Sequence, residues 1–308
     1  MRFGLVGTGY WARATHASAI ALTPGTTLSA VWGRNPQATA DLAGEHGAMP
    51  FTGTDAIDAF LESVDAVAFS VPPDVQAPIA TRAARAGKHL LLEKPVALSV
   101  ADADALAAAV DEAGVASIVF FTLRFAGEIR AWLTDENARG GWTGHGWSGG
   151  HGEWLGANLD SDSPFNTPWR AEKGGLWDLG PHVLSLLWAC LGPISSVTAT
   201  AGAMDLTHLV LTHESGASST ATVTLSAPPA AAATNVYVWG EAGRSIMPTA
   251  PWDPVECLRT ALRELLAMVE TGQVEHPCDV RLGRDIVHVL AAAQAQLDNT
   301  RPAKSGKP

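Results

Sequence analysis

The stretch Phe3-Gly4-Leu5-Val6-Gly7-Thr8-Gly9-Tyr10-Trp11-Ala12 reads as an apolar strand, a Gly-x-Gly-x-x-Ala turn and the start of a helix. Gly7 would permit a tight turn, Gly9 would let a ligand approach the backbone, and Ala12 would let the helix pack on the strand. The amides at the helix start would bind a diphosphate. Small residues also serve ordinary tight turns, but the position at the head of a strand–helix series favours a dinucleotide-binding turn. The residues expected to contact the dinucleotide here are Gly7, Thr8, Gly9, Tyr10, Trp11 and Ala12.

Beyond this turn, short apolar runs alternate with longer amphipathic ones. Continuous apolar runs are typical of strands covered by helices on both faces, and repeated strand–helix units favour right-handed crossovers. We therefore expect a Rossmann domain with a doubly wound parallel sheet over residues 1–121. The predicted strands are Phe3–Val6, Thr27–Trp32, Ala66–Val71, Leu90–Leu92 and Ser117–Phe121. The predicted helices are Ala14–Leu22, Gln37–His46, Asp55–Leu61, Val75–Ala86 and Val100–Ala113.

The pattern changes after Phe121. Alternating runs such as Leu209–His213 and Ser219–Ser226 flank a hairpin turn, and two long helices, Val255–Thr271 and Cys278–Leu297, come last. Successive strands followed by helices predict an α+β domain over residues 122–308, built on a mostly antiparallel, open-faced sheet.

The composition narrows the class of protein. A length of 308 residues suggests two domains, and 47% hydrophobic with 17% charged residues excludes general disorder. A net charge of −11 argues against nucleic-acid binding, and three cysteines are too few for a disulfide framework or a zinc site. With no basic leader and no run of about 18 apolar residues, we expect a cytoplasmic protein that does not enter a membrane.

The end of the second predicted strand bears on cofactor choice. It reads Val31-Trp32-Gly33-Arg34-Asn35 and lacks the carboxylate that would bind a ribose 2′-hydroxyl. Arg34 suits a 2′-phosphate through a forked, charge-assisted contact, although it also reads as a solvated surface arginine. We therefore expect Arg34 and Asn35 to contact the cofactor, with NADP preferred over NAD.

Lys94 follows a predicted parallel strand, at the edge where ligands of such sheets bind. Its ammonium group could stabilise negative charge on a reacting oxygen, with Glu93 holding the lysine, and Pro95 restricts Lys94 to an extended conformation. Taken alone, Lys-Pro is more typical of a surface turn than of a functional site.

Asp178 and His182 are four residues apart. Either both project from one helical face, or Asp178 caps a helix whose first turn carries His182. Histidine titrates near neutrality and suits proton transfer from a hydroxyl, but a helix cap and a core histidine explain the pair as well.

Several motifs in order resemble one family. After the glycine turn come Val71-Pro72-Pro73, then Glu93-Lys94-Pro95, Trp169-Arg170, the stretch Gly174-Gly175-Leu176-Trp177-Asp178-Leu179-Gly180-Pro181-His182, and His276-Pro277. Across nearly the whole chain the sequence resembles the Gfo/Idh/MocA oxidoreductases, the family of glucose–fructose oxidoreductase and inositol dehydrogenase.

The resemblance implies roles for particular residues. His182 would be the acid/base, with Lys94 and Asp178 assisting, and Trp169 and Arg170 would border the nicotinamide and the substrate. Family members often carry histidine where this chain has Gln76, so a contact near the nicotinamide is expected to differ. Further cofactor contacts are expected at Val71, Pro72, Pro73, Gln76, Glu93 and Lys94, and substrate contacts at Lys94, Arg124, Trp154, Trp169, Asp178 and His182.

These expectations describe an NAD(P)-dependent oxidoreductase that interconverts a secondary alcohol and a carbonyl on a sugar, inositol or related polyol. No metal is expected, because His145, His151 and Glu153 lack helical ligand spacing. The resemblance also implies a homodimer or homotetramer that covers the open sheet face. Two alternatives remain open: a dinucleotide-binding regulator without activity, and an NAD-dependent glycoside hydrolase of the same fold.

Overall fold

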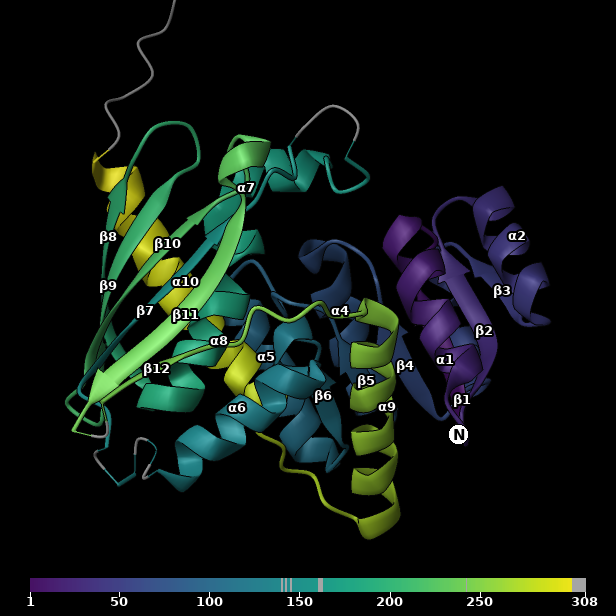
Figure 1. Ribbon diagram of the computed structural model, residues 1–308. Coiled ribbons are helices and arrows are strands. Elements are labelled where there is room, and N and C mark those ends of the chain that lie inside the picture. The colour runs from purple at the N-terminus through teal and green to yellow at the C-terminus, as the bar shows by residue number, and fades with distance from the viewer. Residues whose placement is uncertain (140, 142, 145, 160–162, 242, 301–308) are drawn as a thin grey trace, which may run out of the picture. The chain divides into compact units, whose positions relative to one another are not determined.

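The computed structural model describes residues 1–139, 141, 143–144, 146–159, 163–241 and 243–300 (Figure 1). The chain forms two compact units. The first comprises Met1–Arg130 and Ala250–Val287, and the second comprises Ala131–Thr249 and His288–Pro308. The expected division at residue 121 remains a prediction for the domain boundary, while the packing adds a later segment, Ala250–Val287, to the first unit.

A six-stranded parallel sheet forms the centre of the first unit, in the order β3-β2-β1-β4-β5-β6. This confirms the doubly wound fold. The sequence reading missed β3, whose Pro50 cannot donate to a ladder and is tolerated because the strand lies at the sheet edge. The strands are β1 (Arg2–Val6), β2 (Thr27–Gly33), β3 (Met49–Thr52), β4 (Ala66–Phe69), β5 (His89–Leu92) and β6 (Ser117–Val119).

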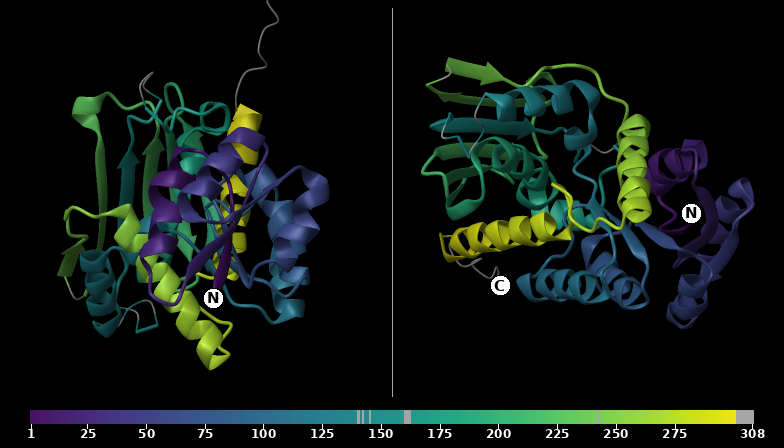
Figure 2. Two further views of the ribbon diagram at one scale, coloured as in Figure 1. Left: turned by 90° about the vertical axis from the view of Figure 1, so that its right-hand side faces the viewer. Right: turned by 90° about the horizontal axis from the view of Figure 1, so that it is seen from below.

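The helices of this unit begin and end at recognisable signals. Asn35 caps α2 by accepting a hydrogen bond from the Ala38 amide, and Ser99 caps α5 in the same way from Asp102. The helices are α1 (Ser18–Leu22) after a π-helical turn (Ala12–Ala17), α2 (Pro36–His46), α3 (Ile57–Glu62), α4 (Pro73–Arg85) and α5 (Val100–Ala113). A late helix, α9 (Pro254–Thr271), packs beside α1, as Figure 2 shows, and also contacts β6.

The second unit contains a six-stranded sheet in the order β12-β11-β7-β10-β9-β8. Among the described strands of this sheet, β7 and β10 alone pair in parallel, so the expectation of a mostly antiparallel sheet is confirmed. The strands are β7 (Gly149–Leu155), β8 (Ile194–Ala201), β9 (Thr207–His213), β10 (Ser218–Thr224), β11 (Ala233–Gly240) and β12 (Gly243–Ile246). Helices α6 (Gly127–Ala138) and α10 (Val280–Thr300) each belong partly to this unit.

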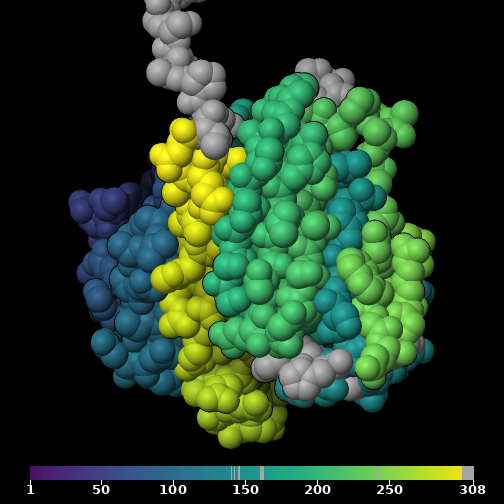
Figure 3. Space-filling model, turned by 90° about the vertical axis from the view of Figure 1, so that its left-hand side faces the viewer, coloured from purple at the N-terminus to yellow at the C-terminus, as the bar shows by residue number. Residues whose placement is uncertain are grey.

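Helices cover one face of this sheet. Helix α7 (Pro168–Asp178) contacts β10, and α8 (Gly180–Leu191) packs on β7, β10 and β11. A Cβ atom on Gly152 would lie 2.4 Å from Val183 Cγ1, so the glycines of β7 let α8 approach closely. On the opposite face Val210 and Trp239 are exposed, and in Figure 3 the green and teal strands face the viewer with no helix across them.

Within the described residues, the structure contains no helix that is both long enough and apolar enough to span a bilayer.

Candidate functional site

The glycine turn after β1 has one closed side and one open side. Gly7 adopts φ +131°, its amide donates to the Trp32 carbonyl over 2.9 Å, and a Cβ there would lie 2.3 Å from the Ser70 carbonyl oxygen. Gly9 is exposed, and apart from its chain neighbours no described residue has an atom within 4 Å of the place its Cβ would take. Gly7 is therefore required by the fold, whereas Gly9 leaves open the space that a diphosphate needs beside a helix start.

The helix that follows this turn is tied to the end of β5 by Glu93. The Trp11 indole Nε1 donates to Glu93 Oε1 over 2.7 Å, and His16 Nε2 lies 3.0 Å from the same oxygen. The other carboxylate oxygen accepts from the Lys94 amide over 3.2 Å. One carboxylate thus joins the glycine-turn helix to the backbone of Lys94, a contact that sequence reasoning did not anticipate for Trp11 and His16.

Gln76, on α4, holds the same loop from another direction. Its side chain is fully buried, donates to the Glu93 carbonyl over 2.8 Å and accepts from the Glu93 amide over 2.8 Å. It also donates to the carbonyls of Pro95 and Val96, each over 3.3 Å. The Lys94–Pro95 peptide bond is cis. The amide of Gln76 is therefore engaged with the backbone around Lys94.

Other predicted cofactor residues also follow the carboxyl ends of the parallel strands, where such sheets bind ligands. Arg34 is exposed directly after β2, whereas the Asn35 side chain is engaged as the α2 cap. Tyr10, beside the glycine turn, is 57% exposed. Val71, Pro72 and Pro73 form the entry to α4, and Thr8 lies half-buried in the turn.

In the second unit, Asp178 and His182 lie on either side of a helix junction. Gly174 has a non-helical backbone that divides α7, and one further turn leads to Asp178, the last residue of that helix. His182 lies in the first turn of α8, whose N-cap is Leu179. Leu179 between the two helices keeps a right-handed helical backbone, so the arrangement is close to the reading in which a helix that begins near Leu176 carries both residues. The N-cap of α8 is Leu179 and not Asp178, so the reading of Asp178 as the cap was wrong.

The Asp178 carboxylate is held by Arg170. Arg170 Nε donates to Asp178 Oδ2 over 3.0 Å, and Asp178 is only 2% exposed. The guanidinium lies 4.8 Å from the Trp169 ring centroid and 5.5 Å from that of Phe165. Arg170 is therefore paired inside its own unit and stacked between aromatic rings, which fixes the orientation of the buried carboxylate.

His182 packs against Trp154 of β7. The ring centroids are 4.9 Å apart with an interplanar angle of 38°, and the imidazole is buried. Lys94 and the half-buried Arg124, on the 3₁₀ turn Thr122–Phe125, belong to the first unit. The structure therefore brings together Asp178 with Arg170 and Trp169, and His182 with Trp154, whereas the convergence of these groups with Lys94 stays a prediction.

Asp205, which the sequence did not single out, fixes the start of the turn that leads to Asp178. Its Oδ2 accepts from the Gly175 amide over 2.8 Å and from the Leu225 amide over 2.7 Å, and Oδ1 accepts from Thr224 Oγ1 over 2.7 Å. Burial raises the pKa of Asp205, but hydrogen bonds from Thr224, Leu225, Ser226 and Gly175 outweigh it and lower the pKa below its ordinary value.

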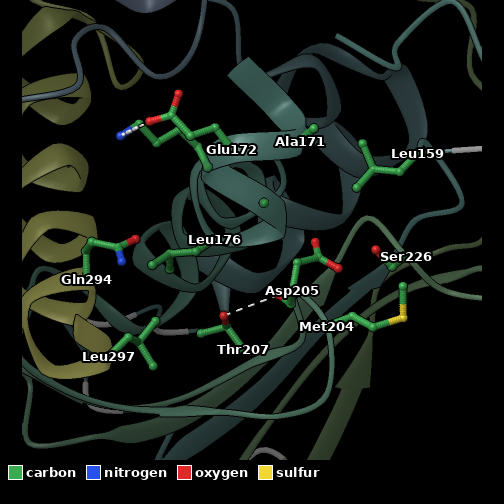
Figure 4. Close-up of a pocket in the computed structure, with 12 residues that line it drawn as sticks. Leu159, Ala171, Glu172, Leu176, Met204, Asp205, Thr207, Ser226, Gln294 and Leu297 are labelled. Carbon is green, nitrogen blue, oxygen red and sulfur yellow. Dashed lines mark hydrogen bonds and ion pairs between the residues drawn. The ribbon is translucent and has the colours of Figure 1, made fainter. Parts of the chain in front are cut away.

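A hollow of about 320 Å³ lies beside this carboxylate, as Figure 4 shows. Its lining mixes apolar side chains such as Leu176 and Leu297 with the polar groups of Glu172, Lys173 and Asp205. For metals, the described residues contain no group of three or more His, Cys, Asp or Glu side chains placed to hold an ion. His145 lies outside the described residues, so the cluster considered with His151 and Glu153 is described only in part.

Family models match both parts of the chain. Residues 1–121 match an oxidoreductase family with an NAD-binding Rossmann fold, and residues 148–246 match the GFO/IDH/MocA C-terminal domain. The first unit thus has an NAD(P)-binding Rossmann fold, which agrees with the open space beside Gly9.

Two curated relatives match part of the chain. Inositol 2-dehydrogenase of Rhizobium meliloti is 35% identical over 125 residues, which cover 41% of this chain and 37% of the relative. UDP-N-acetylglucosamine 3-dehydrogenase of Acidithiobacillus ferrooxidans is 36% identical over 106 residues, covering 34% of this chain and 32% of the relative. The matched region spans about a third of the length of these relatives.

Solved structures share the fold along nearly the whole chain. A levoglucosan dehydrogenase in complex with NADH and levoglucosan has a TM-score of 0.81 at 19% identity, with 97% of each chain covered. A putative myo-inositol dehydrogenase from Sinorhizobium meliloti has a TM-score of 0.80 at 22% identity, with 98% of each chain covered. From its two family matches and its fold, this chain belongs to the Gfo/Idh/MocA oxidoreductase family.

Proposed function

We propose that this protein is an NAD(P)-dependent oxidoreductase that interconverts a secondary alcohol and a carbonyl on a sugar, an inositol or a related polyol. One observation carries the proposal. Glu93 accepts hydrogen bonds from Trp11, in the helix after the glycine turn, and from the amide of Lys94. The Glu93 carboxylate thereby joins the backbone of the Glu-Lys-Pro motif to the segment that would hold a dinucleotide.

The cofactor would be held by the glycine turn and by the segments that follow the parallel strands. Gly9 offers open space for the diphosphate beside the start of the following helix. When bound, the nicotinamide supplies or accepts the hydride.

In this proposal Lys94 and His182 both act on the reacting oxygen, in different roles. The Lys94 ammonium would hydrogen-bond this oxygen and stabilise the negative charge that develops there. His182 would take the hydroxyl proton in oxidation and return it in reduction. Asp178, oriented by Arg170, would assist by binding a second hydroxyl or by favouring the protonated imidazole.

The substrate class follows from the chemistry of the relatives and of the second unit. Relatives named for inositol and for a nucleotide sugar act on ring hydroxyls, which supports a cyclic polyol or sugar. The Trp154 ring against His182 offers a flat apolar surface of the kind that stacks on a sugar ring. Trp169 would add a second such surface.

NADP is proposed as the preferred cofactor. Arg34 is exposed immediately after β2, with no carboxylate in the segment Gly33–Asn35 to bind a ribose 2′-hydroxyl. Competitive titration of NAD and NADP against fluorescence of the reduced nicotinamide tests this point, and tighter binding of NAD would contradict it.

A homodimer or homotetramer is proposed to cover the open face of the second sheet. Val210, Trp239 and Ile246 are exposed there at 55%, 42% and 57%, and a sheet face of this kind is usually covered. Light scattering at micromolar concentration tests it, and a monomer would contradict it.

The main experiment is a screen of sugars, inositols and small carbonyls with both cofactors. Substrate-dependent change in the absorbance of the reduced nicotinamide supports the proposal. Bond cleavage without a net change in that absorbance would identify a redox-assisted glycoside hydrolase. Dinucleotide binding without turnover of any compound would indicate a regulator, and either result would overturn the proposed function.

A further inference from the structure

The backbone at Gly174 and Gly175 starts a new helical turn. Gly174 has φ +66° and ψ −168°, which interrupts α7, and the Leu179 amide then bonds the Gly175 carbonyl over 2.9 Å. Gly175 is thus the first residue of the turn that leads to Asp178. Its amide has no acceptor within that turn, since the first amides of any helical segment lack one.

Asp205 supplies the missing acceptor from 30 residues further along the chain. Its Oδ2 accepts from the Gly175 amide and from the Leu225 amide, while Oδ1 accepts from Thr224 Oγ1. A carboxylate at a helix start is favoured both by these bonds and by the helix dipole. The same side chain therefore caps the turn and ties it to the end of β10.

The glycines let the turn lie directly on that strand end. A Cβ on Gly175 would lie 2.6 Å from Thr224 Cα, and one on Gly174 would lie 3.0 Å from Asp205 Cβ. Any side chain at position 175 would push the turn away from the strand, and the bond from Asp205 would lengthen with it.

Both candidate proton-handling groups depend on where this turn lies. Asp178 is its last residue and reaches Arg170, which lies before the break at Gly174. His182 packs on Trp154, whose strand position pairs with Val223, next to Thr224. The strand end that Asp205 binds is thus also next to the platform on which His182 rests.

We propose that Asp205 is a positioning residue for the Asp178–His182 pair, acting as a remote cap of the turn that carries Asp178. This inference rests on the proposed role of His182 in proton transfer. Asp205 itself takes part in no step of the reaction.

The test compares Asp205→Asn and Asp205→Ala with wild type, and uses Glu172→Gln as the matched control. Glu172 lines the same hollow, and its carboxylate pairs with Lys173 over 3.0 Å. Amide hydrogen exchange of peptides covering residues 174–182 is measured on the protein without substrate. Exchange is expected to rise most in Asp205→Ala, less in Asp205→Asn, which keeps one oxygen acceptor, and not in Glu172→Gln.

Turnover and cofactor binding are measured on the same variants. The Asp205→Ala substitution is expected to lower kcat by about tenfold or more, since small misplacements of catalytic groups have large effects on rate. The dissociation constant for the reduced dinucleotide should stay within about twofold, because the dinucleotide-binding turn lies in the other unit. Partial rescue of kcat in Asp205→Asn would separate positioning from a general loss of folded protein.

The two proposals fail in different ways. Unchanged exchange at residues 174–182 in both Asp205 variants, or unchanged kcat in Asp205→Ala, would overturn the role of Asp205. A wild-type protein without turnover would overturn the proposed function, and unchanged exchange would then still refute the cap. If Asp205→Ala does not fold, Asp205→Asn alone gives the exchange and kcat comparison.

Discussion

The loop that carries Lys94 is held by an amide, whereas the turn that leads to Asp178 is held by a carboxylate. Gln76 meets one backbone amide and three backbone carbonyls, so it must both accept and donate. Asp205 meets only donors: two backbone amides and the hydroxyl groups of Thr224 and Ser226. Each anchor has the functional group that its backbone partners require, because a carboxylate cannot donate and an amide has a single acceptor oxygen. The Gln76 anchor of the first half is therefore neutral, although the Glu93 carboxylate also contacts this loop, whereas the Asp205 anchor of the second half is charged.

Removing the ammonium group of Lys94 should have the largest effect of the substitutions considered, and the effect should be on kcat. Lys94→Met is expected to lower kcat by about a thousandfold, through loss of charge stabilisation at the reacting oxygen. Dinucleotide affinity should change little, because most of the cofactor contacts are expected at the glycine turn and at the segments after the other strands. Steady-state kinetics and dinucleotide titration check this, with Lys173→Met in the second unit as the control. Retained turnover in Lys94→Met would refute the role of the lysine.

Replacing the Gln76 amide by a carboxylate should lower the free energy of unfolding. Gln76→Glu places an acceptor against the carbonyls of Glu93, Pro95 and Val96 and removes the donor they share. We expect the free energy of unfolding to fall by about 3 kcal/mol at neutral pH, because buried partners are left unpaired. Urea denaturation measures it, with Gln76→Met as the uncharged comparison. Equal stability of Gln76→Glu and wild type would show that the amide donor is not needed.

The second anchor should respond to pH, unlike the first. The pKa of Asp205 is lowered in the folded protein, so its stabilising contribution is full above the ordinary pKa and is lost as pH falls through the folded value. At neutral pH, Asp205→Asn should reduce the free energy of unfolding by about 1–2 kcal/mol. This difference should shrink in acid, as measured by urea denaturation across a pH series. A difference that does not vary with pH would show that the charge of Asp205 does not contribute to the stability of the fold.

Glycine-to-alanine substitutions compare a tightly packed glycine of the second half, Gly175, with an open one of the first half, Gly9. A Cβ at Gly175 meets Thr224 backbone, so Gly175→Ala should destabilise the fold by about 1–3 kcal/mol through overpacking. Gly9→Ala meets open space and should change stability by less than about 0.5 kcal/mol. Gly9→Ala should nevertheless weaken dinucleotide binding, because its methyl group fills the space beside the turn. Thermal unfolding and dinucleotide titration separate these effects, and unchanged dinucleotide affinity in Gly9→Ala would place the cofactor elsewhere.

Local patterns in the sequence predicted much of the first unit. Continuous apolar runs marked five of its six strands, and the glycine turn lies where the pattern placed it. The edge strand β3 was missed because Met49-Pro50-Phe51-Thr52 lacks both an apolar run and alternation. The alternating strands of the second unit were predicted, since period-two patterns mark half-buried strands, and the two final helices of the chain were predicted as well.

The contacts that hold the candidate site could not be predicted in the same way. The sequence around Asp205 is typical of an exposed loop, and no neighbouring residue in the sequence indicates that its partner, Gly175, lies 30 residues earlier. Trp11, His16 and Glu93 meet across about 80 residues, so their pairing depends on strand order rather than on spacing. The break at Gly174 could not be predicted, because the turn that follows it is held by this long-range contact, which local helix signals do not encode.

Helix α9 returns to the first unit after the chain has built the second sheet. Its buried side chains, among them Leu258, Leu262 and Leu265, pack where α1 and β6 would otherwise lie open. A fragment that ends at residue 121 would leave this apolar surface exposed to solvent and would therefore be prone to aggregate. To express the nucleotide-binding half alone, the segment 250–287 would therefore have to be fused to the N-terminal segment of the first unit. Recombination between relatives would likewise succeed only if both pieces were inherited together.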